Sequence, residues 1–441
     1  MMRLFAALSF AAFAFVATAP AALAVNIEKI TSPSGIPAWL VREQAVPLVT
    51  LNYSFHGGSS QDPAEKPGTA NFASDLLDEG AGELDAKAFH ERTESKAIEL
   101  SFQVGRDEFH GSLRALNENR EEAFDLLRMA LTAPRFDADA VDRVRRQEIA
   151  GLQRDISNPN SIASKRWWAT AFPNHPYGRE GKGTLESVPT ISVADLRDYV
   201  RRVFARNELT ISIVGDVDAK TAGELIDRAF AKLPAKNDLK PVADVKPAGL
   251  GRRIVVNLDV PQAVITFGGL GLARKDPDFM AGYIVNHILG GGSFSSRLYR
   301  EVREKRGLAY GVSDSLVWFK RAAVVLGGTA TRADRTAEAL SIIELETKRM
   351  ADEGPTADEL ESAKSYLKGA YALSLDTSAK IAAQLTQIQL DGLGIDYMQR
   401  RSAMIDAVTL DDAKRVAKRL FGGGMLVTVV GKPKDLASTP E

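Results

Sequence analysis

The chain has 441 residues, of which 45% are hydrophobic and 26% are charged. This length is about three times that of a typical domain, so we expect two or three globular domains rather than a disordered, collagenous or coiled-coil chain. The 56 Lys and Arg residues balance 57 Asp and Glu residues, so no basic excess indicates a nucleic acid partner. Cysteine is absent, which excludes disulfides, thiolate metal sites and thiol nucleophiles.

The segment Met1–Ala24 has the layout of a secretory signal peptide. Arg3 gives a positive start, Leu4–Val16 is an apolar run broken only by a serine, and residues 22–24 (Ala-Leu-Ala) resemble a cleavage site. The run is shorter than the ~20 apolar residues that a membrane-spanning helix needs, and no later stretch of that length is apolar. We therefore expect cleavage after Ala24, export to the periplasm and no membrane span in the mature chain.

The rest of the chain contains two similar halves. One landmark is a strand followed by an Asp-Pro pair, which occurs as Leu48–Phe55 with Asp62-Pro63 and again as Ala263–Gly268 with Asp276-Pro277. The other landmark closes each half and consists of a Ser/Thr-capped helix and a short β-branched strand that ends at glycine. Both landmarks recur at a spacing of about 215 residues, which indicates a duplicated domain.

Further elements favour an α+β fold in each half. Paired antiparallel strands are predicted over Ile98–Val104, Glu108–Leu116, Ala309–Trp318 and Ala322–Gly328, and helices over Val141–Ile156, Ala333–Asp352 and Ala357–Leu373. Each half would then be a mostly antiparallel sheet covered by helices. We expect an N-terminal domain over 25–235, a linker with two prolines over 236–251, and a C-terminal domain over 252–441.

Three segments resemble the pitrilysin/insulinase family of zinc peptidases, in particular its two-domain bacterial branch, which is related to the mitochondrial processing peptidase. They are His175-Pro176-Tyr177-Gly178-Arg179 with Gly183 and Glu186, Leu289-Gly290-Gly291-Gly292 with Ser295-Ser296-Arg297-Leu298-Tyr299, and Arg303-Glu304-Lys305-Arg306-Gly307-Leu308-Ala309-Tyr310. The match covers nearly the whole mature chain. The resemblance implies two similar α+β domains per chain. It also implies that active members enclose a chamber with four such domains, so this branch needs two chains.

The zinc motif of the family is missing from the first half. Catalytic members carry H-x-x-E-H on the first helix, where two His bind Zn²⁺, the Glu is the general base, and a distal Glu completes the ligands. By resemblance, Asn71, Ser74 and Asp75 stand at the His, Glu and His positions, and Glu148 stands at the distal position. Asn is a poor zinc ligand, and Ser has no carboxylate to take a proton from water. We therefore expect no zinc and no catalytic residue in this chain alone, with a weak metal site at Asp75 and Glu148 as an alternative.

The second half retains residues that match the family's substrate-binding positions. Arg303 and Tyr310 have the seven-residue spacing of an Arg/Tyr pair that binds the peptide near the scissile bond. An Arg fork and a Tyr hydroxyl can both donate to a carbonyl or a developing oxyanion. Gly290, Gly291 and Gly292 match a glycine-rich loop that contacts substrate in the non-catalytic subunit of the processing peptidase, although a helix C-cap also explains them.

Together these features predict a zinc-less, substrate-binding subunit of an exported two-chain zinc peptidase. Its partner would carry H-x-x-E-H and the zinc, and its substrates would be peptides. The sequence leaves open the identity of the partner and whether the dimer is homo- or heteromeric. The alternative is a periplasmic peptide-binding or scaffold protein of the same fold with no proteolytic role.

Overall fold

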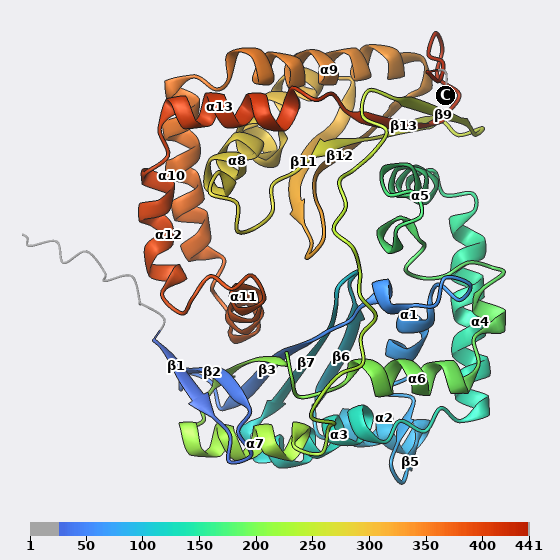
Figure 1. Ribbon diagram of the computed structural model, residues 1–441, viewed down its shortest axis with the longest axis vertical. Coiled ribbons are helices and arrows are strands. Elements are labelled where there is room, and N and C mark those ends of the chain that lie inside the picture. Colours follow the sequence, from blue (N-terminus) through green and yellow to red (C-terminus); the bar gives the residue numbers. More distant parts are fainter. Residues whose placement is uncertain (1–25, 440–441) are drawn as a thin grey trace, which may run out of the picture.

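The computed structural model describes residues 26–439, so the predicted signal peptide lies outside the described residues. Within that range the two halves of the chain lie on opposite sides of the molecule, with the blue-to-green half below the yellow-to-red half in Figure 1. Each half contains one large sheet and its own hydrophobic core. The predicted α+β fold with two similar domains is therefore confirmed.

The two sheets have the same strand order. In the first half it is β1-β2-β8-β3-β7-β6, and in the second it is β11-β12-β10-β13-β9, which is the same order of repeat-related strands from the other edge, except that β1 has no counterpart in the second sheet. Among the described strands of these large sheets, only β2 with β8 and β9 with β13 are parallel pairs. The strands are β1 (Ile27–Thr31), β2 (Pro37–Arg42), β3 (Leu48–His56), β6 (Glu99–Val104), β7 (Glu108–Leu116), β8 (Thr210–Gly215), β9 (Arg253–Asn257), β10 (Gln262–Leu270), β11 (Ala309–Trp318), β12 (Ala323–Arg332) and β13 (Leu426–Gly431).

Helices cover these sheets in both halves (Figure 1). The first half contains α1 (Thr69–Ser74), α2 (Ala86–Ser95), α3 (Arg120–Thr132), α4 (Ala138–Asp155), α5 (Pro159–Ala171), α6 (Val193–Val203) and α7 (Ala219–Phe230), with the small strands β4 (Gly80–Ala81) and β5 (Leu84–Asp85). The second half contains α8 (Phe279–Asn286), α9 (Thr336–Glu353), α10 (Ala357–Leu373), α11 (Ser378–Leu390), α12 (Tyr397–Asp406) and α13 (Leu410–Phe421). The predicted elements are recovered with small shifts at their ends, the largest being β12, which continues to Arg332 because its last residues pair with the start of β10.

Each half contributes one helix that packs on the sheet of the other half. Helix α5 of the first half packs on β10 and β13 of the second, and α11 of the second half packs on β3 and β8 of the first. Trp167 on α5 is fully buried, and its indole N–H donates to the carbonyl oxygen of Leu426 at 3.0 Å. On α11, the Thr386 hydroxyl donates to the Ser212 hydroxyl at 3.0 Å. This reciprocal packing fixes the two sheets relative to each other.

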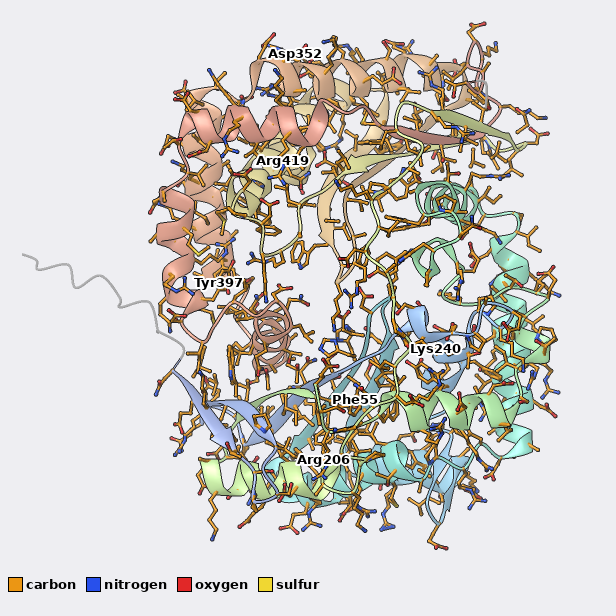
Figure 2. The ribbon with its side chains drawn as sticks, in the orientation of Figure 1. Phe55, Arg206, Lys240, Asp352, Tyr397 and Arg419 are labelled. Atoms are coloured by element: carbon orange, nitrogen blue, oxygen red, sulfur yellow. The ribbon has the colours of Figure 1, made fainter. Side chains whose placement is uncertain are left out.

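The core of the first half is aromatic and lies between the sheet and its helices. Phe55 on β3, labelled in Figure 2, stacks on Phe204 with ring centroids 4.8 Å apart. Phe109 and Phe230 pack around the same ring. Alternation along β7 buries every second residue, as expected for a strand with one face on a core. On the other side of the sheet, α11 of the second half covers β3 and β8, whereas β6 keeps exposed residues.

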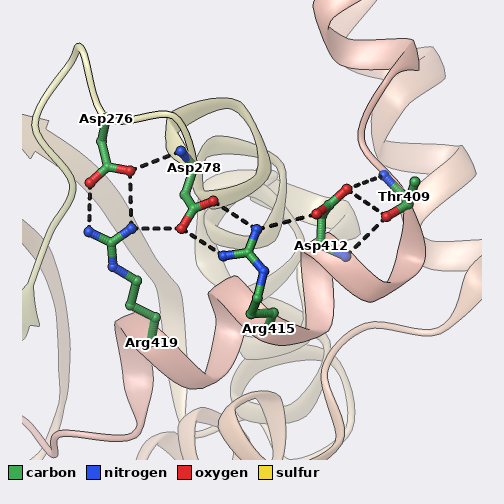
Figure 3. Close-up of polar contacts among 6 residues, drawn as sticks. All are labelled: Asp276, Asp278, Thr409, Asp412, Arg415 and Arg419. Carbon is green, nitrogen blue, oxygen red and sulfur yellow. Dashed lines mark hydrogen bonds and ion pairs between the residues drawn. The ribbon is translucent and has the colours of Figure 1, made fainter.

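The C-terminal helix α13 is tied to the entrance of α8 by a group of ion pairs (Figure 3). Arg419 pairs with Asp276 at 2.6 Å and with Asp278 at 2.7 Å, while Arg415 pairs with Asp278 at 2.8 Å. These contacts hold the pKa of Asp278 down to about 2, mainly through the hydrogen bond from Arg415. Thr409 and Asp412 form the capping box that begins α13.

The predicted linker, 236–251, contains no helix or strand and runs along the molecule between the two sheets (Figure 1). It is held by backbone contacts, since Lys240 exchanges two hydrogen bonds with the side chain of Gln61 and Val245 donates to the carbonyl of Arg321. The domain boundaries at either end of it stay a prediction. Among the described residues, no helix is long and apolar enough to cross a membrane.

Candidate functional site

Helix α1 carries the positions at which the family's zinc motif would lie. It is short, and its first turn is fixed by Asp62, whose carboxylate accepts from the backbone N–H groups of Gly68 and Ala70, both at 2.8 Å. Gly68 has a φ of 96° and lies against Gly183, so a side chain at either glycine would clash. The loop after the His175–Arg179 segment thus packs directly on the start of α1.

The side chains at the motif positions bond to one another. The Asn71 amide donates to the Asp75 carboxylate at 2.9 Å, and the Ser74 hydroxyl donates to the Asn71 carbonyl oxygen at 2.8 Å. An imidazole at either end of this turn would present a lone pair to a metal, whereas Asn71 presents an N–H donor to its neighbour. The local hydrogen bonds of α1 are therefore satisfied without an ion.

Glu148 on α4 lies beside Asp75, as the sequence predicted for the distal ligand. Burial and then the hydrogen bond and charge of Glu148 raise the pKa of Asp75 to about 7, while Lys182 acts in the opposite direction. Asp75 therefore keeps its proton up to about neutral pH. Both line a cavity of about 410 Å³, together with Asp78 and Glu79.

These residues do not fit a catalytic zinc ion. Within residues 26–439, no group of three or more His, Cys, Asp or Glu side chains could hold a metal. The pair formed by Asp75 and Glu148 supplies no nitrogen ligand, and Ser74 supplies no general base. Zinc-dependent attack of water on a peptide bond thus finds neither its metal ligands nor its base on α1 and α4.

A larger cavity of about 990 Å³ also borders α1. Asn71 lines it, as do Val104 and Gly105 at the end of β6 and several residues of α5. Strand β6 is the last strand of its sheet, so its outer N–H and C=O groups have no partner among the described strands. An extended peptide could add to this edge through backbone hydrogen bonds.

Arg106 is a residue of this cavity that the sequence analysis missed. Its guanidinium lies 3.7 Å from the centroid of the Trp168 ring and 5.3 Å from that of Phe319, which belongs to the second half. Burial lowers its pKa to about 10, so it stays charged. A single arginine after a strand gives no sequence signal, because the two rings come from distant segments.

Tyr177, in the predicted family segment, joins the two halves instead of facing a substrate. Its hydroxyl donates to the buried Asp107 carboxylate at 2.6 Å, and it accepts from the backbone N–H of Arg321 at 3.1 Å. Asp107 also accepts from the backbone N–H of Lys320 at 2.8 Å. His175 accepts from the Tyr177 N–H through Nδ1 at 3.2 Å and contacts the linker carbonyl of Ala243 through Nε2 at 2.9 Å. This segment therefore connects both halves and the linker.

Tyr310 is the second residue of β11, which is the edge strand of the second sheet, and Arg303 lies in the π-helix Tyr299–Glu304 that precedes this strand. The register of β11 against β12 shifts between Ala309 and Val312, so Tyr310 lies in a β-bulge. Bulges redirect side chains and are common beside functional sites. Tyr310 is 87% exposed, the largest fraction among the exposed large hydrophobic residues that the structure describes.

Neighbouring charges leave the guanidinium of Arg303 unpaired. Glu301 accepts from Lys305 at 2.7 Å and from Arg306 at 2.8 Å, and these bonds, that of Lys305 first, lower the pKa of Glu301 to about 2. Arg303 forms no ion pair with any described carboxylate and lies 4.8 Å from the centroid of the Tyr299 ring. Of the cations in this predicted segment, it is the one available to a ligand.

The glycine run has a packing role that the sequence could not separate from binding. A side chain on Gly290 would come within 2.6 Å of the buried Asp314 carboxyl, and one on Gly292 within 2.8 Å of the His287 carbonyl oxygen. Residues His287–Gly291 form a π-helix after α8, where the sequence predicted the helix to end. The next turn exposes Phe294, which packs edge-on against Tyr299. Gly290 is therefore required by the fold, and Tyr299 joins Phe294, which follows the run, to Arg303.

Comparison with known protein families gives two matches along the chain. Residues 40–184 match the model described as insulinase (peptidase family M16), and residues 190–367 match the model described as the peptidase M16 inactive domain. The chain belongs to peptidase family M16. It is a member in which the described residues at the zinc-site positions form no zinc-binding set.

Relatives share this family over most of their length. The chain is 26% identical over 380 residues to a Helicobacter pylori protein named "Non-peptidase homolog YmxG", which covers 86% of this chain and 87% of that protein. It is 26% identical to "Uncharacterized zinc protease SCO5738" of Streptomyces coelicolor, over 93% of this chain and 90% of that one. It is 23% identical to a probable mitochondrial-processing peptidase subunit beta of Arabidopsis thaliana, over 92% and 78% of the two chains.

Solved structures agree with the fold. A peptidase M16 inactive domain from Pseudomonas fluorescens superposes with a TM-score of 0.86 and 27% identity, over 94% of this chain and all of that one. A protease from Helicobacter pylori superposes with a TM-score of 0.83 and 19% identity, over 92% of this chain and all of that one. The second likeness, at its low identity, concerns the fold alone.

Proposed function

We propose that this chain is the zinc-less, substrate-binding subunit of an exported two-chain zinc peptidase. The observation that carries the proposal is the contrast between α1 and the segment Arg303–Tyr310, which runs from a π-helix into β11. The residues at the zinc positions bond to one another, whereas Arg303 and the 87% exposed Tyr310 present donors that no described residue accepts. A peptidase that contains such a chain would need a partner chain to bind the zinc, and this chain would supply Arg303 and Tyr310 as hydrogen-bond donors.

Arg303 and Tyr310 would act on the reacting carbonyl held by the partner. A guanidinium fork and a phenol hydroxyl are both donors, and placed at the scissile carbonyl oxygen they stabilise the negative charge that develops there. The partner would hold the zinc through H-x-x-E-H, and the zinc would supply the activated water. This chain would then contribute binding and charge stabilisation, with no proton transfer of its own.

The edge strands β6 and β11 support a peptide as the substrate. Each ends its sheet, so each offers a row of backbone groups that an extended peptide can pair with. Hydrogen bonds to the peptide backbone depend little on the substrate's side chains. Such binding suits a chamber that selects peptides or unfolded segments by size and shape. Phe294 is exposed and packs against Tyr299, on which Arg303 also lies, so Phe294 would contact the same peptide.

Export to the periplasm belongs to this proposal and rests on Met1–Ala24, which has the layout of a signal peptide. The mature chain would start at Val25, shortly before β1. Mass analysis of the chain isolated from the periplasmic fraction would show this start. An intact N-terminus on a chain that stays in the cytoplasm would contradict export.

A peptidase assay on a quenched fluorogenic peptide with added zinc tests the proposal. The samples are this chain without Met1–Ala24, a candidate partner with an intact H-x-x-E-H motif, and a mixture of the two. We expect activity only in the mixture and loss of that activity with a chelator. Activity of this chain alone would contradict the account. Absence of both activity and a complex on sizing would favour the alternative, a periplasmic scaffold or peptide-binding protein.

A further inference from the structure

A second cavity lies in the C-terminal half, away from both the zinc positions and Arg303. It has a volume of about 440 Å³ and lies where α8, α10, α11, α12 and the end of β11 meet. Six Phe, Trp and Tyr residues line it: Phe279, Tyr283, Trp318, Tyr366, Tyr371 and Tyr397. Tyr366 and three further lining residues, Gly291, Ser374 and Gln387, are exposed, so the cavity opens to solvent. Tyr397 is labelled in Figure 2, at the start of α12.

The internal repeat relates this cavity to the larger cavity beside α1. Helices α10 and α11 correspond to α4 and α5, and the end of β11 corresponds to the end of β6. Gln384 and Gln387 of α11 stand where α5 has Lys165 and Trp168, and all four line their respective cavities. The duplicated fold thus makes a cavity at the same place in each half, and the second one has its own lining.

One of the two cations in this cavity is neutralised by the protein. Arg274 pairs with Asp391 at 3.5 Å and donates to the Tyr397 hydroxyl at 2.7 Å. Asp391 also accepts from the indole N–H of Trp318 at 3.0 Å. Arg274 further lies 4.1 Å from the centroid of the Phe279 ring. The charge of Arg274 is therefore balanced by Asp391, and it needs no anionic ligand.

Arg401 is the other cation, and it lacks a counter-charge. It is only 6% exposed, donates one hydrogen bond, to the Leu367 carbonyl oxygen at 3.0 Å, and forms no ion pair with any described carboxylate. Its guanidinium lies 4.2 Å from the centroid of Tyr371 and 5.8 Å from that of Tyr283. Buried charges in proteins are normally paired, so an unpaired guanidinium on a cavity wall favours an anionic ligand.

Tyr371 provides a second unused donor on the same wall. Its hydroxyl oxygen is buried and has no hydrogen-bond partner among the described residues. Burial raises the pKa of Tyr371 to about 12, so the hydroxyl keeps its proton at neutral pH. A buried hydroxyl without a partner costs free energy unless a ligand completes it.

We propose that this cavity binds the free C-terminal carboxylate of a short peptide whose last side chain is large and apolar. The carboxylate accepts hydrogen bonds from Arg401 and Tyr371, and the apolar side chain packs among Phe279, Tyr283 and Trp318. The volume lies in the range of small-ligand sites, ~300–1,000 Å³. The choice of a peptide over another organic carboxylate rests on the proposed function, since a peptidase chamber generates new C-termini.

Binding to the purified chain alone, without any partner, tests this site. The probes are N-acetyl-Ala-Phe with a free carboxylate, the same dipeptide as its C-terminal amide, and 3-phenylpropionate, each measured by isothermal titration calorimetry. We expect the acid to bind and the amide to bind at least about tenfold more weakly, because it loses the charge-assisted bonds. No binding of the acid, or equal binding of acid and amide, would overturn the proposal. Equal binding of 3-phenylpropionate would overturn its assignment to peptides.

Two tyrosine variants locate the site. Tyr371→Phe should weaken binding of the acid by about fivefold or more without loss of stability, because its hydroxyl has no partner within the described residues. Tyr53→Phe is the matched control, since its hydroxyl is also buried without such a partner but lies in the core of the other half. Wild-type binding by Tyr371→Phe would overturn the assignment. Arg401→Gln should weaken binding of the acid more than Tyr371→Phe does. If Arg401→Gln does not fold, Tyr371→Phe alone tests the site.

This test can fail separately from the proposed function. Binding is measured on a single chain with no turnover, whereas the two-chain activity depends on Arg303, Tyr310 and the partner's zinc. Peptidase activity in the mixture with no binding of the dipeptide acid would overturn only the proposal that the cavity binds peptide C-termini. Binding of the acid with no peptidase activity would leave the cavity and overturn the two-chain enzyme.

Discussion

The two halves of the molecule use the same landmark in opposite ways. In the second half, Asp276 lies on the surface and pairs with Arg419 of α13, which lowers its pKa. In the first half, Asp62 turns inward to cap α1, and its burial raises its pKa to about 7. Arg202 of α6, the repeat-related residue of Arg419, donates to the Gln61 carbonyl oxygen instead. The duplicated backbone therefore fixes where a residue lies and not what it contacts.

The same contrast extends to the candidate site. The first half has satisfied the side chains of its zinc positions internally. The second half keeps two arginines without a counter-charge and a tyrosine hydroxyl without a partner among the described residues. A buried unpartnered group is costly, which concerns Arg401 and the Tyr371 hydroxyl on the cavity wall, whereas the unpartnered Tyr53 hydroxyl of the first half lies in a packed core. Under the proposed function, the ligand-binding groups of this chain lie in its C-terminal half.

The helices exchanged between the halves give the largest expected effect. Trp167→Ala should lower the free energy of unfolding by about 3–5 kcal/mol, because it empties a fully buried site and leaves the Leu426 carbonyl without its donor. Urea unfolding followed by circular dichroism measures this.

Thr386 on α11 stands at the repeat-related position and is the matched control. Thr386→Val removes one buried hydrogen bond with little change in volume, and should cost only about 1 kcal/mol. Equal losses of unfolding free energy in the two variants would contradict the larger contribution predicted for Trp167.

The bridge between the halves gives the next effect. Asp107→Ala should cost about 2–3 kcal/mol, because the Tyr177 hydroxyl and the Lys320 N–H both lose a charged acceptor. Asp107→Asn should cost less, since it keeps one acceptor oxygen. A wild-type unfolding midpoint for Asp107→Ala would contradict the structural role assigned to the His175–Arg179 segment.

The carboxyl pair on α1 and α4 gives the smallest effect, and its sign depends on pH. The native pKa of Asp75 is raised from 3.8 to about 7, so the native state binds a proton between these values that the unfolded state does not. Stability therefore falls as the pH rises from about 4 to about 7. Asp75→Asn should flatten this fall and be more stable than wild type at pH 8, by on the order of 1 kcal/mol after allowance for partial exposure.

Unfolding curves at pH 5 and pH 8 measure this difference. Glu148→Gln should act in the same direction, because it removes the other member of the pair. A steeper loss of stability with pH in either variant would show that the two carboxyl groups are not competing for one proton.

Much of the fold could be predicted from the sequence because the repeat is carried by local signals. Capping boxes, Asp-Pro pairs and β-branched strands that end at glycine are short-range features, and the structure has α6, α13, β8 and β13 where they occur. The α+β class followed from these local patterns. The substituted zinc positions followed from the resemblance of the chain to the family. The exchange of α5 and α11 could not be predicted, because it depends on contacts between segments far apart in the chain.

The candidate site was predictable only in part, for a similar reason. Arg303 and Tyr310 were assigned from the resemblance to the family, whose Arg/Tyr pair has the same spacing, but the bulge at Tyr310 arises from the pairing of β11 with β12. Arg106 and Arg401 were missed because the rings around each come from segments far apart in the chain. Gly290 was noted, although its packing against Asp314 could be seen only in the fold.

The central claim is that this chain supplies Arg303 and Tyr310 to a zinc held by another chain. The most direct measurement is kcat/KM of the two-chain enzyme assembled with Arg303→Ala or Tyr310→Phe, compared with wild type. The account predicts intact assembly and a barrier raised by about 2–4 kcal/mol in both variants. Unchanged kcat/KM in both would contradict it.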